Sequence, residues 1–501
     1  MRHAVDPSFL ALPLEGLANA ALTRADELGA DDASVRILRT RTGRLRLRDG
    51  IVQAATDSVD TGLGVRLVHD GAWGYAATMD LSTAAAARAA EQAVAVARAC
   101  RPLRRSPVIL AGEAVHPRAV WVSSYDIDPF DVPEGERVAL LASWSHRLLA
   151  APAVQHVLAL FTAVRENRFY ADTAGTRATQ QRVRVHPMVI AFGGVPEGET
   201  QSLRTSGPPA GRGWEYLTGS GWDWDAELAA LPDELAAKSR ARPVRAGNYD
   251  LVIDSSNLWL TIHETVGHAT ELDRALGYEA SYAGTTFVPP DGAGTLRFGS
   301  PLMNVTADRT TDHGLATIGV DDEGVAAQSW ELVRDGVLTG LQTDRRTAAL
   351  TGASRSTGCS FAESAEYPPL ARMPNVSLRA APTGPDVAGL ISAVPDGIYL
   401  AGANSWSIDP RREHFQFTAQ RCYRIRSGRL DGQLSGVAYQ GRTTEFWGAL
   451  AALGGPGTYG LFGADLCGKG QPVQASAASH GCPAAVFSGV RVVRAGAEDG
   501  L

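Results

Sequence analysis

Residues 250–268 read DLVIDSSNLWLTIHETVGH and predict a strand that leads directly into a helix. Asp250–Asp254 is typical of a short buried strand, and Ser255, Ser256 and Asn257 are candidate N-cap residues for the helix. Apolar residues then recur at helical spacing, at Ile262, Val266, Ala269, Leu272 and Leu276. We therefore expect an amphipathic helix with one face buried.

The helix carries His263 and His268 on either side of Glu264. Two imidazoles beside a carboxylate can hold a metal ion and supply a general base. On a regular α-helix a spacing of five residues separates the two rings by about 140°, so this pair cannot chelate without a distortion. A single π-turn would bring the rings together, and Gly267 would ease it because glycine has no Cβ. The alternative is a core helix with two satisfied histidines.

Two histidines leave a catalytic zinc site one protein ligand short. A thiolate is a good zinc ligand, and glycines flank Cys467 in the run 463–471, which predicts a tight loop. Glu271 could instead orient His268 without binding the metal. The candidates for the third ligand are Glu271, Asp273, His313, His414, Cys467 and His480. The alternative for Cys467 is a buried free thiol.

Composition excludes several classes of protein. The net charge is −7, and the sequence shows no basic patch of the kind that would follow a phosphate backbone, so we expect no nucleic-acid substrate. No apolar run approaches the ~20 residues that span a bilayer, and Met1–Arg24 does not have the pattern of a signal peptide. Five widely spaced cysteines argue against a disulfide framework. We therefore expect a soluble cytoplasmic protein.

The 501 residues exceed one ordinary domain. We expect an α+β fold in three parts: an α+β module at 1–115, a central α/β segment at 116–242 and a β-rich C-terminal domain at 243–501. The N-terminal half should mix helices with antiparallel strands, and the C-terminal half should be mainly β, barrel-like or sandwich-like, and carry the metal helix. Helices are expected at 14–28, 82–100, 134–150 and 224–240.

Short strands separated by turn residues are expected in both halves. The region 195–221 is rich in Gly, Ser, Thr and Pro and predicts a loop. The expected strands are 33–38, 42–49, 51–58, 62–69 and 73–78 in the first module, and 294–298, 315–319, 326–334, 337–343, 397–401, 415–425 and 434–440 in the C-terminal domain.

Several motifs in the same order make the chain resemble the TldD/PmbA family of metallopeptidases over nearly its whole length. The resemblance is to the TldD branch, which carries HExxxH followed by an acidic pair and a cysteine in a C-G-K-G-Q setting. The corresponding residues here are His263–His268, Glu271 with Asp273, and Cys467–Gln471. Further agreement is found at Gly62–Arg66, Asp321–Gly324, Leu332–Leu338, Arg372–Asn375 and Phe415–Phe417.

The resemblance implies a zinc peptidase with one Zn²⁺ per chain, bound by His263, His268 and Cys467. Glu264 would be the general base, and a zinc-bound water would be the nucleophile. His480, His414 and Arg372 are options for stabilising the oxyanion, and the alternative, which the sequence favours for each, is a surface or core role.

The family also implies a homodimer, or a heterodimer with a metal-free paralogue, that acts on unfolded or extended polypeptides. Two alternatives are a non-catalytic peptide-binding subunit with a structural metal, in which His480 or Cys482 would complete the site, and a zinc amidase acting on a non-peptide amide.

Overall fold

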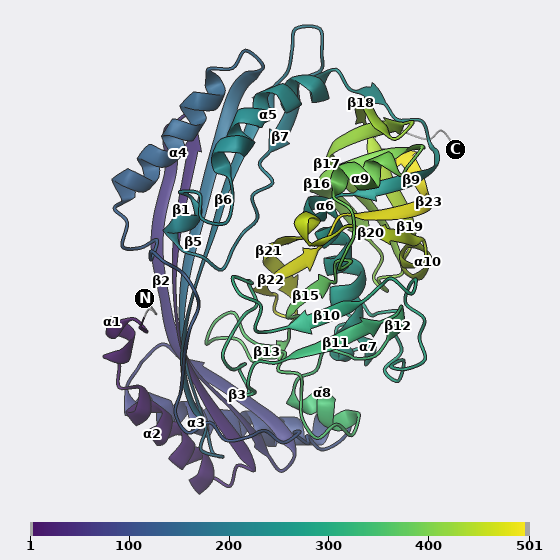
Figure 1. Ribbon diagram of the computed structural model, residues 1–501. Coiled ribbons are helices and arrows are strands. Elements are labelled where there is room, and N and C mark those ends of the chain that lie inside the picture. Colours follow the sequence, from purple (N-terminus) through teal and green to yellow (C-terminus); the bar gives the residue numbers. More distant parts are fainter. Residues whose placement is uncertain (1–3, 496–501) are drawn as a thin grey trace.

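The computed structural model describes residues 4–495 and contains two halves that lie side by side (Figure 1). A tall sheet with helices forms the N-terminal half, and a β-rich C-terminal half carries the helix with the two histidines. The predicted fold class is therefore confirmed. Residues 1–3 and 496–501 lie outside the described range. The first three belong to Met1–Arg24, the segment whose pattern is not that of a signal peptide.

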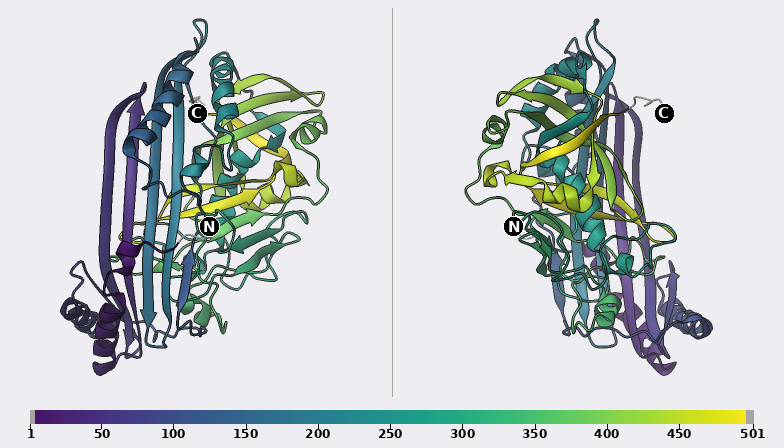
Figure 2. Two further views of the ribbon diagram at one scale, coloured as in Figure 1. Left: turned by 60° about the vertical axis from the view of Figure 1, so that its left-hand side comes forward. Right: turned by 90° about the vertical axis from the view of Figure 1, so that its right-hand side faces the viewer.

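The N-terminal sheet takes its strands from both of the first two expected segments. Its order is β3-β2-β1-β5-β6-β4, with β7 beside β6. The long central strands run nearly the full height of the molecule (Figure 2). The strands are β1 (Asp32–Arg48), β2 (Ile51–His69), β3 (Ala72–Thr78), β4 (Ala119–Val122), β5 (Val154–Asp172), β6 (Arg177–Gly193) and β7 (Gln201–Arg204). The domain limits at 115 and 242 stay predictions.

Side chains alternate between the two faces of β1, and helices cover one of these faces. The odd-numbered residues Val35 and Ile37 pack with the helices at one end, and Leu45 and Leu47 pack with those at the other. The even-numbered residues point away from these helices. The helices are α1 (Pro7–Leu10), α2 (Leu14–Glu27) and α3 (Thr83–Cys100) at the first end, and α4 (Glu134–Leu149) and α5 (Trp224–Ser239) at the second.

The C-terminal half is built on a closed barrel. Its strands follow the order β16-β9-β23-β19-β17, and the pairing of β17 with β16 closes the ring. A large apolar core fills it and extends to the neighbouring sheet. The barrel strands are β9 (Gly247–Ile253), β16 (Asp396–Ile408), β17 (His414–Arg426), β19 (Val437–Arg442) and β23 (Ala485–Arg494), with β8 (Arg242–Pro243), β18 (Arg429–Ser435) and β20 (Leu450–Leu453) attached.

Smaller elements surround the barrel. One sheet contains β10 (Val305–Asp308), β11 (Ser329–Arg334), β12 (Val337–Leu338) and β15 (Asn375–Leu378). Two hairpins are β13 (Ser360–Phe361) with β14 (Leu370–Ala371), and β21 (Gly460–Lys469) with β22 (Gln474–Cys482). The helices are α6 (Ser255–Ile262), α7 (Leu272–Ala275), α8 (Arg345–Leu350), α9 (Val387–Ser392) and α10 (Thr443–Gly448). No helix within residues 4–495 combines the length and apolar character needed to cross a bilayer.

Several expected strands differ from the observed ones. The four short strands expected at 33–38, 42–49, 51–58 and 62–69 are two long strands, β1 and β2. Polar residues suggested breaks between them, but the two strands stay paired there, with Arg39 opposite Thr61 and Arg41 opposite Val59. The expected loop 195–221 includes β7, which pairs with β6. The expected strands 294–298 and 315–319 are loops, since each makes only isolated bridges at most.

Candidate metal centre

The metal helix starts from the middle of the barrel wall. Strand β9 lies between β16 and β23, and its last residues lead into α6. Asp254 caps this helix, because its Oδ1 accepts from the Ser256 amide at 2.9 Å. The N-cap is therefore one residue before the predicted candidates, since the carboxylate of Asp254 ends the strand and reaches the first turn.

The predicted π-turn is present between the two histidines. The α-helix ends at Ile262, residues His263–Gly267 form a π-helix, and the amide of His268 donates to the carbonyl of His263. The two imidazole ring centroids consequently lie only 4.8 Å apart. Gly267 has φ −54°, which any residue can adopt. Its missing Cβ instead leaves room for Met373, whose Sδ would lie 3.0 Å from such a Cβ.

Cys467 reaches the histidines from a β-hairpin. The run expected to be a tight loop is strand β21, because the chain continues to pair with β22 up to Lys469. The register shifts between Ala464 and Cys467, and this bulge re-aims the side chain. The Cys467 Sγ lies 3.2 Å from His268 Nε2. One nitrogen from each of His263 and His268 and the Cys467 sulfur all lie within 4.8 Å of one another.

Neighbouring groups fix the tautomers of both histidines. The carbonyl of Val376 can only accept, so His480 Nδ1, at 3.1 Å, donates to it. The Nε2 of His480 then accepts from His263 Nδ1 at 2.7 Å, which leaves a lone pair on His263 Nε2. Burial lowers the pKa of all three histidines, so their rings are neutral near pH 7.

Glu271 orients the second histidine. His268 Nδ1 donates to Glu271 Oε2 at 3.0 Å, because a carboxylate only accepts, and the lone pair of His268 Nε2 faces Cys467. Although burial raises the pKa of Glu271, Lys469 and His268 hold it well below its usual range. The Nε2 lone pairs of His263 and His268, together with the Cys467 sulfur, form a donor set that suits zinc. The other nitrogen of each histidine, Nδ1, holds its ring in place through a hydrogen bond.

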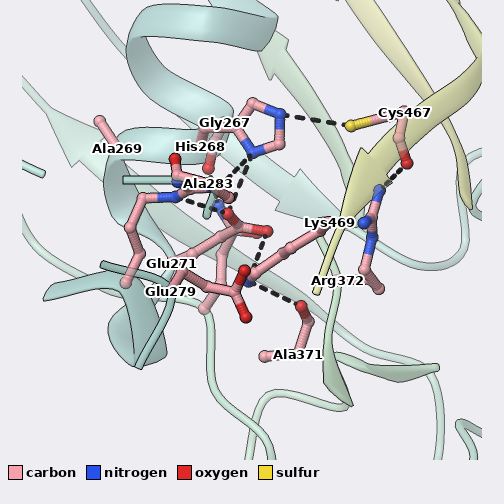
Figure 3. A network of polar contacts seen from close by, with 12 residues as sticks. Gly267, His268, Ala269, Glu271, Glu279, Ala283, Ala371, Arg372, Cys467 and Lys469 are labelled. Atoms are coloured by element: carbon pink, nitrogen blue, oxygen red, sulfur yellow. Dashed lines mark hydrogen bonds and ion pairs between the residues drawn. The ribbon is translucent and has the colours of Figure 1, made fainter. Parts of the chain in front are cut away.

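Buried charges tie the hairpin to the metal helix (Figure 3). Lys469 is fully buried, and its Nζ lies 3.2 Å from Glu271 Oε1 and 2.8 Å from Asp273 Oδ2. Arg372, also buried, donates to the carbonyl of Cys467. Burial raises the pKa of the Cys467 thiol, whereas the charge of His268, when that ring carries a proton, and the charge of Arg372 lower it by more, so the net shift is towards the thiolate.

Glu264 lies beside the metal ligands and forms a buried ion pair that the sequence did not reveal. The Nη1 of Arg412 donates to Glu264 Oε2 at 2.6 Å. Among the described residues, none donates a hydrogen bond to the other oxygen, Oε1. Arg412 comes from the turn between β16 and β17 and has φ 60°. No local pattern marks this arginine, because its partner is 148 residues away in the chain.

These residues line a cleft of about 500 Å³ between the two halves of the molecule. The wall from the C-terminal half includes both histidines, Glu264, Arg412 and Cys467, and the N-terminal sheet contributes His186, Met188 and Arg204. His186 Nδ1 and Asp465 Oδ2, 2.9 Å apart, join the sheet to the hairpin. Trp406 and Leu466, 56% and 68% exposed, give the cleft apolar surface.

The other predicted candidates lie outside the three-residue cluster. Glu271 and His480 contact the histidines, and Asp273 binds Lys469. His313 is bonded to the carbonyl of Gly211, and His414 is exposed on β17. Further candidates have structural partners: Cys482 Sγ contacts the carbonyl of Ser255 at 3.6 Å, while Arg372 binds main-chain carbonyls of the hairpin. His480 is thus not an oxyanion donor, since both of its nitrogens are engaged.

Comparisons with known proteins agree over most of the chain. Residues 246–494 match the PmbA/TldA metallopeptidase C-terminal domain, and residues 33–97 match PmbA/TldA metallopeptidase domain 1. A metalloprotease of Methanothermobacter thermautotrophicus is 26% identical over 88% of this chain and 91% of its own length. A metalloprotease TldD homologue of Haemophilus influenzae is 27% identical over 85% and 86%.

A more distant relative carries the word zinc in its name. The zinc metalloprotease TldD homologue of Saccharolobus solfataricus is 24% identical over 51% of this chain and 54% of its own. Among solved structures, a candidate modulator of a DNA gyrase from Thermotoga maritima is 14% identical and superposes with a TM-score of 0.76 over 96% of this chain and 100% of its own. TldE from Thermococcus kodakarensis, also 14% identical, gives 0.71 over 94% and 98%. These two structures have the same fold.

Proposed function

Because this chain belongs to the TldD/PmbA family of metallopeptidases, we propose that it hydrolyses peptide bonds in unfolded or extended polypeptides at a site built on one zinc ion. The observation that supports this most directly is the convergence of His263, His268 and Cys467 beside Glu264 in an open cleft. The HExxxH spacing, made compatible with chelation by the π-helix, is that of the TldD branch.

The residues divide the chemistry between them. His263, His268 and Cys467 hold the metal, and their partners His480 and Glu271 keep the free nitrogens aimed at it. Bound zinc supplies a Lewis acid that makes water nucleophilic near neutral pH and polarises the scissile carbonyl. Glu264 Oε1 takes a proton from the attacking water as the C–O bond forms, and returns it to the leaving nitrogen as the C–N bond breaks.

Arg412 positions the base in this scheme. Its hydrogen bond to Glu264 Oε2 holds the carboxylate in one orientation and leaves Oε1 for the proton. Arg412 also lines the cleft, so its charge lies near the oxygen that becomes negative during the reaction.

Two features of the cleft support an extended substrate. Within the described residues strand β21 pairs with β22 alone, so its other edge has no partner strand. An extended peptide can add to such an edge through main-chain hydrogen bonds, which suits unfolded segments of varied sequence. The cleft also has a volume of about 500 Å³ and is lined by residues from both halves of the molecule, which leaves room for a peptide segment.

We also propose a cytoplasmic dimer, either with a second copy or with a metal-free paralogue. The stretch of β2 from Ile51 to Asp60 pairs only with β1, is exposed, and includes Ile51 and Val59 at 67% and 59% exposure. Such a long free edge is a template for pairing with another chain. All five cysteines are free within the described chain, which suits a reducing compartment.

The decisive test is Glu264→Gln. Glutamine preserves shape and can still accept from Arg412, so zinc content and fold should stay unchanged, while hydrolysis of an unfolded polypeptide falls by about 10²-fold or more. Glu445→Gln, on an exposed side chain of α10, is the matched control and should keep full activity. Chelation should abolish the wild-type activity and zinc should restore it.

Three results would contradict the proposal. A Glu264→Gln protein with wild-type turnover would place the base elsewhere. Cleavage of small amides but not of polypeptides would favour the amidase. A zinc-bound wild-type protein that binds polypeptides without cutting them, alone or with a paralogue, would favour the binding subunit.

A further inference from the structure

We infer that the N-terminal sheet presents a basic face beside the cleft, and that this face binds acidic segments of the extended polypeptide substrate. The inference rests on the proposed peptidase function, because it assigns a charge preference to that same substrate. The chain as a whole is acidic, with a net charge of −7, so a basic surface beside the cleft is a local feature. Carboxylates border this surface: Asp465 pairs with His186, and Glu166 and Glu363 line a cavity together with Arg44.

The face consists of three rows of residues that lie directly opposite one another across the strands. Residues paired in an antiparallel register point to the same side of a sheet. The rows are Thr56-Arg44-Thr162-His186, Ala54-Arg46-Leu160-Met188, and Ile51-Arg48-Leu158-Ile190-Arg204. We call these residues the arginine face. It contains four arginines and one histidine, and no carboxylate.

The arginines at its centre have no strong partners. Arg44, Arg46 and Arg48 alternate with Leu45 and Leu47, which are buried under α4 and α5, so the arginines extend from the opposite side and are exposed. Among the described residues, neither Arg44 nor Arg46 forms an ion pair or side-chain hydrogen bond, and Arg48 has only a 3.8 Å contact with Asp49. The charges are therefore available to a ligand.

The arginine face continues directly from the cleft. His186, Met188 and Arg204 end the three rows and also line the cleft beside the proposed metal ligands. Arg44 lines a second cavity, of about 120 Å³, which shares His186 and Asp465 with the first. The arginines of β1 therefore lie two strands away from the cleft-lining residues of β6.

The chemistry of the face favours a polypeptide as its occupant. From Arg44 to Arg48 the charges span about 13 Å, at roughly 3.3 Å per residue, which matches every second side chain of an extended peptide. Leu158, Leu160, Met188 and Ile190 lie between the arginines and the cleft and are half-buried. Carboxylate side chains can pair with the arginines while apolar groups contact this strip. A phosphate backbone would leave the apolar strip without a partner.

Peptide binding tests the inference independently of catalysis. We would use the zinc-loaded Glu264→Gln protein and three labelled unstructured peptides of matched length, one rich in Glu, one in Gln and one in Lys. The Glu-rich peptide should bind roughly tenfold more tightly than the Gln-rich one by fluorescence anisotropy, since several exposed ion pairs add. The difference should shrink as salt is raised. The variant R44Q/R46Q/R48Q should remove it.

The control is R105Q/R118Q/R429Q, which removes the same charge from exposed positions outside the arginine face and should keep the preference. Absence of a preference in the starting protein, or its survival in R44Q/R46Q/R48Q, would overturn the inference. The inference would also be overturned if duplex DNA competed equally well with the Glu-rich peptide. It would likewise be overturned if R44Q/R46Q/R48Q lost its dimer in sedimentation experiments but kept an unchanged peptide preference. If the wild-type protein cuts the Gln-rich and Glu-rich peptides equally well, the peptidase function stands and the charge preference fails. If the wild-type protein binds the Glu-rich peptide preferentially but cuts none of the peptides, the charge preference stands and the peptidase function fails.

Discussion

Among single residues, Cys467 best distinguishes a zinc site from a pair of buried histidines. Its Sγ lies 3.2 Å from His268 Nε2, and its lowered pKa favours the thiolate that zinc requires. Replacing Cys467 by Ala should therefore lower zinc affinity by at least about 100-fold, because one of three protein ligands is lost. Competition with a chromophoric chelator would measure the change.

Cys482→Ala is the matched control for this prediction. Cys482 is also buried, but among the described residues its thiol makes a hydrogen bond only to the carbonyl of Ser255, and it lies outside the candidate metal cluster, so its removal should leave zinc affinity near that of the wild type. If Cys467→Ala keeps its zinc, the third ligand is another residue, and Glu271 becomes the first candidate.

The sequence predicts the candidate ligands, the candidate base and Glu271 as a group that could orient His268, but it does not predict the contacts of Arg412 and His480. His263, Glu264 and His268 are close in the chain, and a recognisable setting surrounds Cys467. The bonds of Arg412 to Glu264 and of His480 to His263 join residues 148 and 217 positions apart. Such contacts depend on how the barrel closes and how the hairpin packs on it, and a single sequence contains no pattern for either.

At the scale of one element, the π-helix makes the motif able to chelate. Gly267→Val should damage it, since the new Cβ would lie 3.0 Å from Met373 Sδ and the branched methyl groups need still more room. Overpacking of this kind costs about 1–3 kcal/mol. We expect lower zinc affinity together with a lower denaturant midpoint, measured by chelator competition and by urea unfolding.

Gly267→Ala separates crowding from backbone geometry. The backbone of Gly267 is right-handed, and Met373 ends in a flexible thioether that can shift, so alanine should retain most of the zinc affinity. A valine variant that binds zinc as well as the wild type would show that Met373 yields and that the packing argument is wrong.

Elements defined by local periodicity were predictable, and those defined by distant pairing were not. The helices at Leu14–Glu27 and Glu134–Leu149 follow closely from apolar spacing. Strand β21 was expected to be a loop because glycines flank Cys467 in the run 463–471, yet pairing with β22 keeps it extended. The polar middles of β1 and β2 likewise stay in the sheet because each has a partner strand.

Across the whole molecule, buried ion pairs join the N-terminal sheet to the C-terminal half. Arg168 on the N-terminal sheet pairs with Asp322 of the C-terminal half at 2.7 Å and with Glu166 at 3.2 Å, and all three are buried. Arg66 similarly pairs with Glu323 at 2.6 Å. The contribution of such pairs depends on both halves being docked, so their loss should open the cleft.

Arg168→Met tests this docking through its dependence on pH. Burial raises the pKa of Asp322 and of Glu166, but the arginines around them lower both below their ordinary values. Carboxylates with depressed pKa values stabilise the fold above their unfolded pKa of about 4, and this stability is lost as the pH falls through the folded values. At neutral pH, removing Arg168 leaves two buried carboxylates with weaker compensation, at a cost of about 3–5 kcal/mol.

The difference between Arg168→Met and wild type should therefore shrink as the pH falls from about 4 towards the depressed folded pKa values, where the wild-type carboxylates also become protonated. Asp321, whose pKa is raised to about 8 by burial and by Glu323, titrates in both proteins and largely cancels from the difference. Denaturant unfolding at neutral and acidic pH would measure the trend. Arg147→Met, which breaks an exposed pair with Asp225, should show little effect at either pH. A constant difference across this range would mean that Arg168 contributes by packing, for instance against Phe361, and that its charge does not hold the two halves together.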